Sequence, residues 1–185
     1  VYKRQDWDKA SVSTPDINYR FTRKEDTDTY HITQRFQTPL HPVLHVNARK
    51  EKIRSVKVNG VPATWQSIES AHGYPLLSIQ AEGTSSTTIT IEWEGAPLHT
   101  LAVQEPVITS NGKLALQIPS GASISQVYDP QSVLANHTVE ATAFNAQIKG
   151  EPGHHTFFVY THQGEMDWWQ PVNIYIENVW ESPSY

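Results

Sequence analysis

Apolar and polar residues alternate with a period of two along most of the chain. The clearest stretches place their apolar side chains at every second position, at Leu44, Val46 and Ala48, at Ile89, Ile91 and Trp93, and at Leu114, Leu116 and Ile118. Such alternation is typical of a strand with one buried face, and the i, i+3, i+4, i+7 spacing of an amphipathic helix hardly appears. The pattern therefore predicts an all-β fold.

Turn-forming residues separate the predicted strands at intervals of roughly ten residues. Asparagine and glycine tolerate a positive φ, and proline presets φ at the first corner of a turn. Residues of these types cluster at 58–62, 71–75, 110–113, 119–121 and 150–153. Strands joined by such turns predict an antiparallel β-sandwich.

The sequence Glu94–Gly95–Ala96–Pro97 is the best internal boundary. We expect two tandem small sandwiches of jelly-roll or Ig-like type, over residues 29–97 and 98–185. One larger sandwich that draws strands from both halves is the alternative. Residues 1–28 carry many charges and few apolar neighbours, so we expect a polar connecting segment there, with at most one strand or short helix near Tyr19 to Phe21. Because the chain begins with Val1 in a polar stretch, we expect it to be a piece of a longer protein.

Composition excludes several classes of function. The formal net charge of −5 and the absence of a basic stripe argue against a nucleic-acid partner. The chain has no cysteine, which excludes disulfides, thiolate chemistry and cysteine-based zinc sites. No run of about 18 apolar residues exists, so we expect no membrane insertion.

Two adjacent tryptophans, Trp168 and Trp169, form the most informative feature of the sequence. Adjacent residues of a strand point to opposite faces, so one ring can be buried while the other is exposed. In the strand that follows, Val172, Ile174 and Ile176 share one face. If the strand continues back without a break, Trp168 shares this buried face and Trp169 faces outward. A bulge at Gln170–Pro171 would invert this assignment, because proline often marks an edge or a bulge.

Three interpretations of these rings remain open: a carbohydrate platform, a contact with another part of the parent protein, and an ordinary core. A flat apolar ring can stack on a pyranose while neighbouring polar groups fix its hydroxyls. The candidate carbohydrate-binding residues are Trp168, Trp169, Tyr160, His155 and Asn173.

Other candidate chemistry is weak. His154 and His155 are adjacent and would point to opposite faces of a strand, and no recognisable metal-ligand pattern accompanies them. No serine lies in a Gly-x-Ser-x-Gly motif, and no glycine-rich phosphate loop is present. We expect no catalytic residue, no metal and no cofactor in this chain.

Two regions of the sequence resemble parts of known proteins. The stretch Ser55–Val56–Lys57–Val58–Asn59–Gly60–Val61–Pro62–Ala63, followed by Ile89–Thr90–Ile91–Glu92–Trp93, resembles small β-sandwich modules attached to large bacterial glycoside hydrolases. The second half, from Val127–Tyr128–Asp129–Pro130–Gln131 through 153–159 to 166–172, looks like the accessory region of large secreted polysaccharide-degrading proteins of Bacteroidetes.

The resemblance spans roughly residues 50–177 and implies a context rather than a set of site residues. It implies a non-catalytic module in a periplasmic or cell-surface carbohydrate-active protein, with the catalytic domain of that parent protein as its partner. A carbohydrate-binding module, with a polysaccharide as partner, and an Ig-like adhesion or protein-interaction domain are the alternatives.

Overall fold

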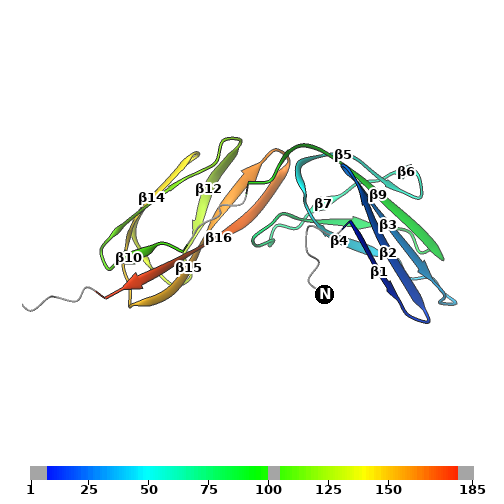
Figure 1. The fold of residues 1–185 in the computed structure, drawn as a ribbon, viewed down its shortest axis with the longest axis horizontal. Coiled ribbons are helices and arrows are strands. Elements are labelled where there is room, and N and C mark those ends of the chain that lie inside the picture. Colours follow the sequence, from blue (N-terminus) through cyan, green and yellow to red (C-terminus); the bar gives the residue numbers. More distant parts are fainter. Residues whose placement is uncertain (1–7, 100–104, 179–185) are drawn as a thin grey trace, which may run out of the picture. The chain divides into compact units, whose positions relative to one another are not determined.

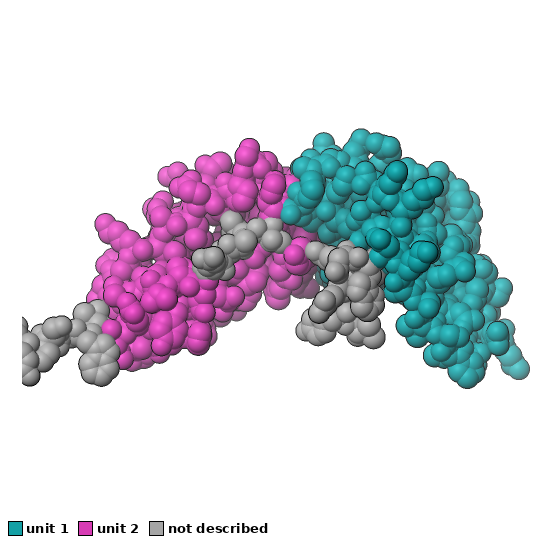
Figure 2. Space-filling model, in the orientation of Figure 1, with its two compact units in different colours: residues 1–68, 76–98 teal, residues 69–75, 99–185 magenta. Residues whose placement is uncertain are grey.

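The computed structural model describes residues 8–99 and 105–178 of the chain, and its regular elements there are all β-strands (Figure 1). They form two compact units, shown in different colours in Figure 2. Unit 1 comprises Val1–Ile68 and Leu76–Leu98, and unit 2 comprises Glu69–Pro75 and His99–Tyr185. In each unit two sheets bury their apolar faces, as in an antiparallel β-sandwich.

Unit 1 contains a six-stranded sheet of order β1-β2-β3-β9-β5-β6 and a three-stranded sheet of order β4-β8-β7, in which neighbouring strands are antiparallel. The strands are β1 (Lys9–Ser13), β2 (Ile17–Lys24), β3 (Thr27–Gln34), β4 (Val43–Asn47), β5 (Lys50–Val58), β6 (Val61–Pro62), β7 (Gln66–Ser67), β8 (Leu76–Gln80) and β9 (Ser86–Pro97). The alternating apolar positions predicted from the sequence are buried. Leu44 and Val46 of β4 are 8% and 6% exposed, and Ile89 and Ile91 of β9 are each 0% exposed.

The expected polar connecting segment over residues 1–28 is wrong for the part that the structure describes. Residues 1–7 lie outside the described residues, but β1 and β2 form a regular antiparallel ladder and β2 continues into β3. The prediction was wrong because it treated the charged residues as solvent-exposed, whereas some of them form ion pairs within the sheet. Arg23 of β2 forms an ion pair with its buried cross-strand partner Asp28, and Phe21, two residues before Arg23 on β2, is fully buried.

The predicted Asn–Gly turn joins β5 to β6. Asn59 and Gly60 have φ values of 51° and 80°, so both central residues occupy the positive-φ region that a two-residue hairpin turn of type I′ requires. The Asn59 carboxamide oxygen also accepts a hydrogen bond of 2.8 Å from the backbone N–H of Thr88. The side chain thus ties the turn to the neighbouring strand β9.

Unit 2 contains a four-stranded sheet of order β10-β16-β15-β12 and a three-stranded sheet of order β11-β14-β13. The strands are β10 (Val107–Thr109), β11 (Lys113–Gln117), β12 (Ala122–Tyr128), β13 (Leu134–Glu140), β14 (Ala143–Ile148), β15 (Gly153–Gln163) and β16 (Met166–Glu177). β10 pairs with β16 in parallel, and the other pairs are antiparallel. Phe144 of β14 and Phe157 of β15 meet between the two sheets, with ring centroids 5.3 Å apart.

The chain changes unit after residue 98, next to the expected boundary at residue 97. Within the described residues, no sheet mixes strands from before and after this point, unlike in the alternative of a single large sandwich. One short segment departs from the simple order. Residues Glu69–Pro75, between β7 and β8 in sequence, belong to unit 2.

Candidate functional site

The two tryptophans lie on opposite faces of β16, as parity predicts. Trp168 is 1% exposed in the core of unit 2, and its indole N–H donates a hydrogen bond of 3.1 Å to the side-chain oxygen of Gln170. Trp169 is half-buried on the outer face of the sheet. A ring as buried as Trp168 has no surface to offer a ligand, so its assignment as a carbohydrate-binding residue is wrong.

Pro171 does not interrupt β16, because its missing N–H lies on the side away from β15. The register between β15 and β16 runs without a shift from Gly153–Ile176 to Gln163–Met166. The backbone N–H groups of Trp169 and Tyr175 both bond to partners other than β15, namely Ala71 and Pro106. Residues of one parity present their N–H to the same side of an extended strand, so Pro171 removes no bond to β15.

Trp169 pairs directly with Tyr160 of β15, and their ring centroids are 5.0 Å apart. Because the Trp169 backbone bonds to the opposite side, this is a non-hydrogen-bonded pair, the type in which cross-strand side chains approach most closely. The pair places two aromatic rings side by side on the outer face of β15 and β16.

Further rings join this pair to form what we call the aromatic face, which consists of His72, Tyr128, Phe158, Tyr160 and Trp169. Tyr128 of β12 lies with its ring centroid 6.1 Å from that of Phe158 and 6.4 Å from that of Trp169. The His72 ring lies 5.4 Å from that of Phe158. The face therefore extends over β12, β15 and β16 and the segment 69–75.

The segment 69–75 pairs with β16 through an isolated parallel bridge. The N–H of Trp169 donates to the carbonyl of Ala71 at 2.9 Å, and the N–H of Gly73 donates to the carbonyl of Trp169 at 2.8 Å. His72 is thereby bridged in parallel to Trp169, which brings its ring to the same face. The sequence suggested only a turn here, since this pairing partner lies about a hundred residues away in the chain.

The rings of the aromatic face pack against one another instead of lying in one plane. The interplanar angle is 52° between Tyr160 and Trp169 and 68° between Tyr128 and Trp169. Tilted and edge-to-face contacts of this kind stabilise a cluster through the ring quadrupoles. The result is a cluster of mutually tilted rings rather than a flat platform.

The pKa of the Tyr160 phenol is raised by its surroundings. Burial raises the pKa of Tyr160, and the nearby carboxylates of Asp167 and Glu69 raise it further. The Asp167 carboxylate also lies 2.6 Å from the Nδ1 atom of His162, next to Tyr160 on the same face. The phenol therefore stays neutral in the ordinary pH range and offers an O–H at the margin of the patch.

The other two candidate carbohydrate-binding residues, Asn173 and His155, lie away from the aromatic face. Asn173 is exposed on the face of Trp169, about 13 Å further along β16, and its side-chain oxygen accepts a hydrogen bond of 2.7 Å from the hydroxyl of Thr156. His155 has the opposite parity, and its Nε2 atom lies 2.7 Å from the carbonyl of Glu151. The structure thus brings Tyr160 and Trp169 together, places Asn173 at a distance, and excludes His155 from the aromatic face.

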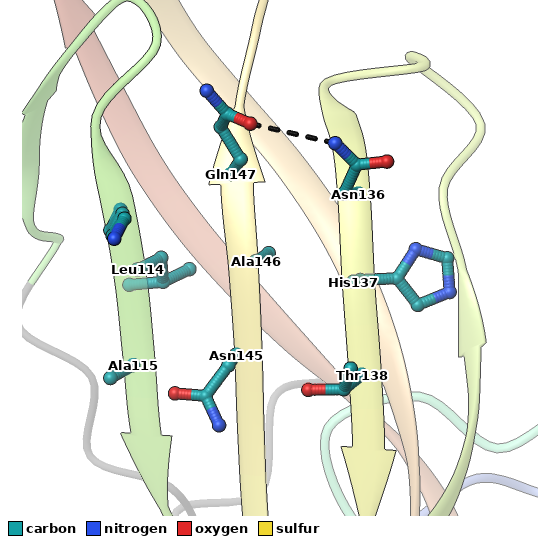
Figure 3. A pocket seen from close by; sticks show the side chains of 9 residues that line it. Leu114, Ala115, Asn136, His137, Thr138, Asn145, Ala146 and Gln147 are labelled. Atoms are coloured by element: carbon teal, nitrogen blue, oxygen red, sulfur yellow. Dashed lines mark hydrogen bonds between the residues drawn. The ribbon is translucent and has the colours of Figure 1, made fainter.

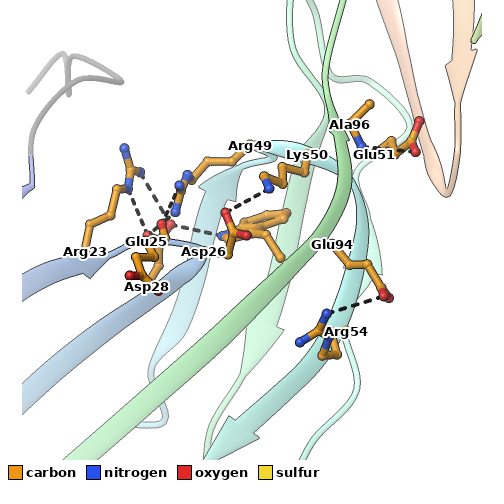
Figure 4. Close-up of polar contacts among 11 residues, drawn as sticks. Arg23, Glu25, Asp26, Asp28, Arg49, Lys50, Glu51, Arg54, Glu94 and Ala96 are labelled. Carbon is orange, nitrogen blue, oxygen red and sulfur yellow. Dashed lines mark hydrogen bonds and ion pairs between the residues drawn. The ribbon is translucent and has the colours of Figure 1, made fainter.

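The most buried carboxylate described, Asp28 of unit 1, is fully engaged in structural contacts (Figure 4). Its Oδ1 atom accepts from Arg23 at 2.9 Å and from Arg49 at 2.8 Å, and its Oδ2 atom accepts from the indole N–H of Trp93 at 3.1 Å. A carboxylate held this way joins β2, β3, β9 and the turn before β5, and is not available as a general base.

Among residues 8–99 and 105–178, no group of three or more histidine, aspartate or glutamate side chains is placed to hold a metal ion. The same residues contain no helix long and apolar enough to cross a membrane. No known family model matches the chain, and no curated protein matches its sequence.

The comparison with solved structures gives a weak likeness. The N-terminal periplasmic domain of ScsB from Proteus mirabilis aligns over 89% of this chain and 96% of that domain, at 8% identity and a TM-score of 0.22. A score this low supports no conclusion about fold or function.

Proposed function

We propose that this chain is a non-catalytic β-sandwich module of a larger carbohydrate-active protein, and that its aromatic face packs against the catalytic domain of that protein. The periplasm or the cell surface is the location that accompanies this function. The proposal is supported by the sequence resemblance described above and, in the structure, by the aromatic face itself.

The observation that carries the proposal is a cluster of apolar rings on the outer face of a sheet. Tyr128 is 58% exposed although it belongs to a cluster with Phe158 and Trp169. Aromatic residues are enriched at protein interfaces, and exposed apolar patches mark interaction sites. Because the rings already support one another, docking would require little further ordering of side chains.

Calorimetric titration of this chain with the remainder of the parent protein tests the proposal. Tyr128→Ala should weaken binding by at least about tenfold, since a central aromatic anchor is typically worth about 2 kcal/mol or more. Val107→Ala is the matched control, because Val107 is 61% exposed on β10 and lies outside the aromatic face. Equal affinities of the wild type and Tyr128→Ala would refute docking through this face.

A carbohydrate contact through the same face is the second candidate. The exposed ring of Tyr128 and the polar Asn173 on the same face of the sheet favour it. Against it stands the mutual tilt of the rings, which leaves no broad flat surface for a pyranose. Affinity electrophoresis in polysaccharide gels distinguishes the two, because a carbohydrate contact predicts retardation that Tyr128→Ala abolishes.

A further inference from the structure

The second sheet of unit 2 has an outer face of very different chemistry. A shallow groove of about 460 Å³ runs over β11, β14 and β13 (Figure 3). Its outward-facing side chains, which define what we call the amide groove, are Lys113, Ala115, Asn136, Thr138, Asn145 and Gln147.

The strand register arranges these side chains in two rows across the sheet. Lys113, Gln147 and Asn136 are cross-strand partners in the first row. Ala115, Asn145 and Thr138 are partners in the second row, about 7 Å further along the strands. Ala115, at the β11 end of the second row, has no side-chain atom beyond Cβ. The groove is therefore deeper at that end.

Most of the hydrogen-bonding capacity of the groove is unused by its own residues. Among the side chains drawn in Figure 3, the single hydrogen bond joins the Asn136 amide nitrogen to the Gln147 amide oxygen, at a long 3.5 Å. Each carboxamide offers two N–H donors and a carbonyl acceptor, and a hydroxyl offers one donor and two lone pairs. The groove therefore presents both donors and acceptors, which suits a ligand whose groups are also both donors and acceptors.

The charge of the groove limits the ligand further. Lys113 is its one permanently charged lining residue, and no carboxylate lines it. The His137 side chain points away from the other lining side chains in Figure 3. A groove without carboxylates does not suit a metal cation, and one lysine is too little to attract a polyanion.

An extended peptide fits this surface less well than a polyol. Peptide recognition on a sheet face depends on pockets for side chains, but the apolar Leu114 and Ala146 beneath the groove are only 5% and 7% exposed. We propose that the amide groove is a binding site for a neutral carbohydrate chain, whose hydroxyls bond to Asn136, Asn145 and Gln147. This site is separate from the aromatic face and does not depend on how that face docks.

Affinity electrophoresis of the full chain in gels containing galactomannan, xyloglucan or glycogen tests the proposal, with polygalacturonate as the charged comparison. We expect retardation by at least one neutral polysaccharide. Asn145→Ala and Gln147→Ala should each raise the dissociation constant by about tenfold, as expected for the loss of a ligand hydrogen bond. Asn47→Ala, an exposed asparagine of β4 in unit 1, is the matched control and should leave binding unchanged.

Several outcomes would overturn the proposal. They are an absence of retardation by all three neutral polysaccharides, retardation by polygalacturonate alone, and variants of Asn145 and Gln147 that bind as tightly as the wild type. Retardation that is lost in Tyr128→Ala and kept in Asn145→Ala would place the ligand on the aromatic face instead. Urea unfolding of each variant measures its stability, so that a loss of binding can be distinguished from a loss of folded protein.

Discussion

Burial separates the adjacent residues Trp168 and Trp169, and their contributions to stability should differ accordingly. Trp168→Ala removes a ring that is 1% exposed and should lower the free energy of unfolding by about 3–5 kcal/mol through lost burial and a cavity. Trp169→Ala removes a half-buried ring and its contact with Tyr160, and should cost much less. Urea melts of both variants measure this difference, and equal small losses would contradict the assignment of the two faces.

Replacement of Asp28 should strongly destabilise unit 1. Asp28→Asn removes the buried negative charge with which the guanidinium groups of Arg23 and Arg49 form ion pairs, and breaking a buried ion pair typically costs about 3–5 kcal/mol. Asp26→Asn is the matched control, because Asp26 bonds to Lys50 at 2.8 Å from a side chain that is 55% exposed. Thermal unfolding should show a large loss for the first variant and little for the second. Similar losses for both would argue against this role of the buried network.

At the scale of elements, the pairing of the segment 69–75 with β16 should depend on Gly73. Gly73 has φ of 82° and donates its N–H to the carbonyl of Trp169. Gly73→Pro removes that donor and cannot adopt a positive φ, so it should release the segment from β16. Amide hydrogen exchange at Trp169, whose N–H bonds to Ala71, should accelerate strongly while the amides of β14 stay protected.

Gly73→Ala provides the control for this experiment, because alanine keeps the N–H donor and introduces only the strain of a positive φ. Exchange at Trp169 should therefore rise less in Gly73→Ala than in Gly73→Pro. Unchanged exchange at Trp169 in Gly73→Pro would show that the pairing does not hold the segment in solution.

Elements with local signals were predictable from the sequence, and elements that depend on distant partners were not. Period-two alternation located β4, β9 and β11, and the Asn59–Gly60 turn was recognisable because positive φ favours those residue types. β2 was underestimated because its charged Arg23 pairs with Asp28 inside the fold. Parity correctly placed Trp168 and Trp169, but no local pattern could show that Tyr128 and His72 would join them.

The amide groove was missed for a similar reason. Asn136, Asn145 and Gln147 come from two strands, and each is an ordinary outward polar position when the strand is read alone. Only the register of β13 and β14 with β11 shows that these positions form two adjoining rows.

For the whole molecule, buried tyrosines predict a loss of stability at alkaline pH. Burial, followed by the charge of Asp28, raises the pKa of Tyr30 and of Tyr19. A tyrosine whose pKa is higher in the folded state favours folding fully below its unfolded pKa of about 10, and this contribution is lost as pH rises through the folded pKa. The free energy of unfolding should therefore decline above about pH 10.

Tyr30→Phe tests this cause, because phenylalanine keeps the ring and removes the ionising group. The variant should show a shallower decline above about pH 10, by at most about 1.4 kcal/mol per pH unit. Identical slopes for the wild type and Tyr30→Phe in alkaline urea melts would assign the decline to other groups.

The central claim, that the aromatic face is covered in the parent protein, is tested most directly by hydroxyl-radical footprinting. Oxidation of Tyr128 and Trp169 is measured by mass spectrometry in this chain alone and in the intact parent protein. Phe36, an exposed ring of unit 1, is the internal reference. We predict that oxidation of Tyr128 and Trp169 falls several-fold in the parent protein relative to Phe36. Equal oxidation of both residues in the two samples would contradict the account.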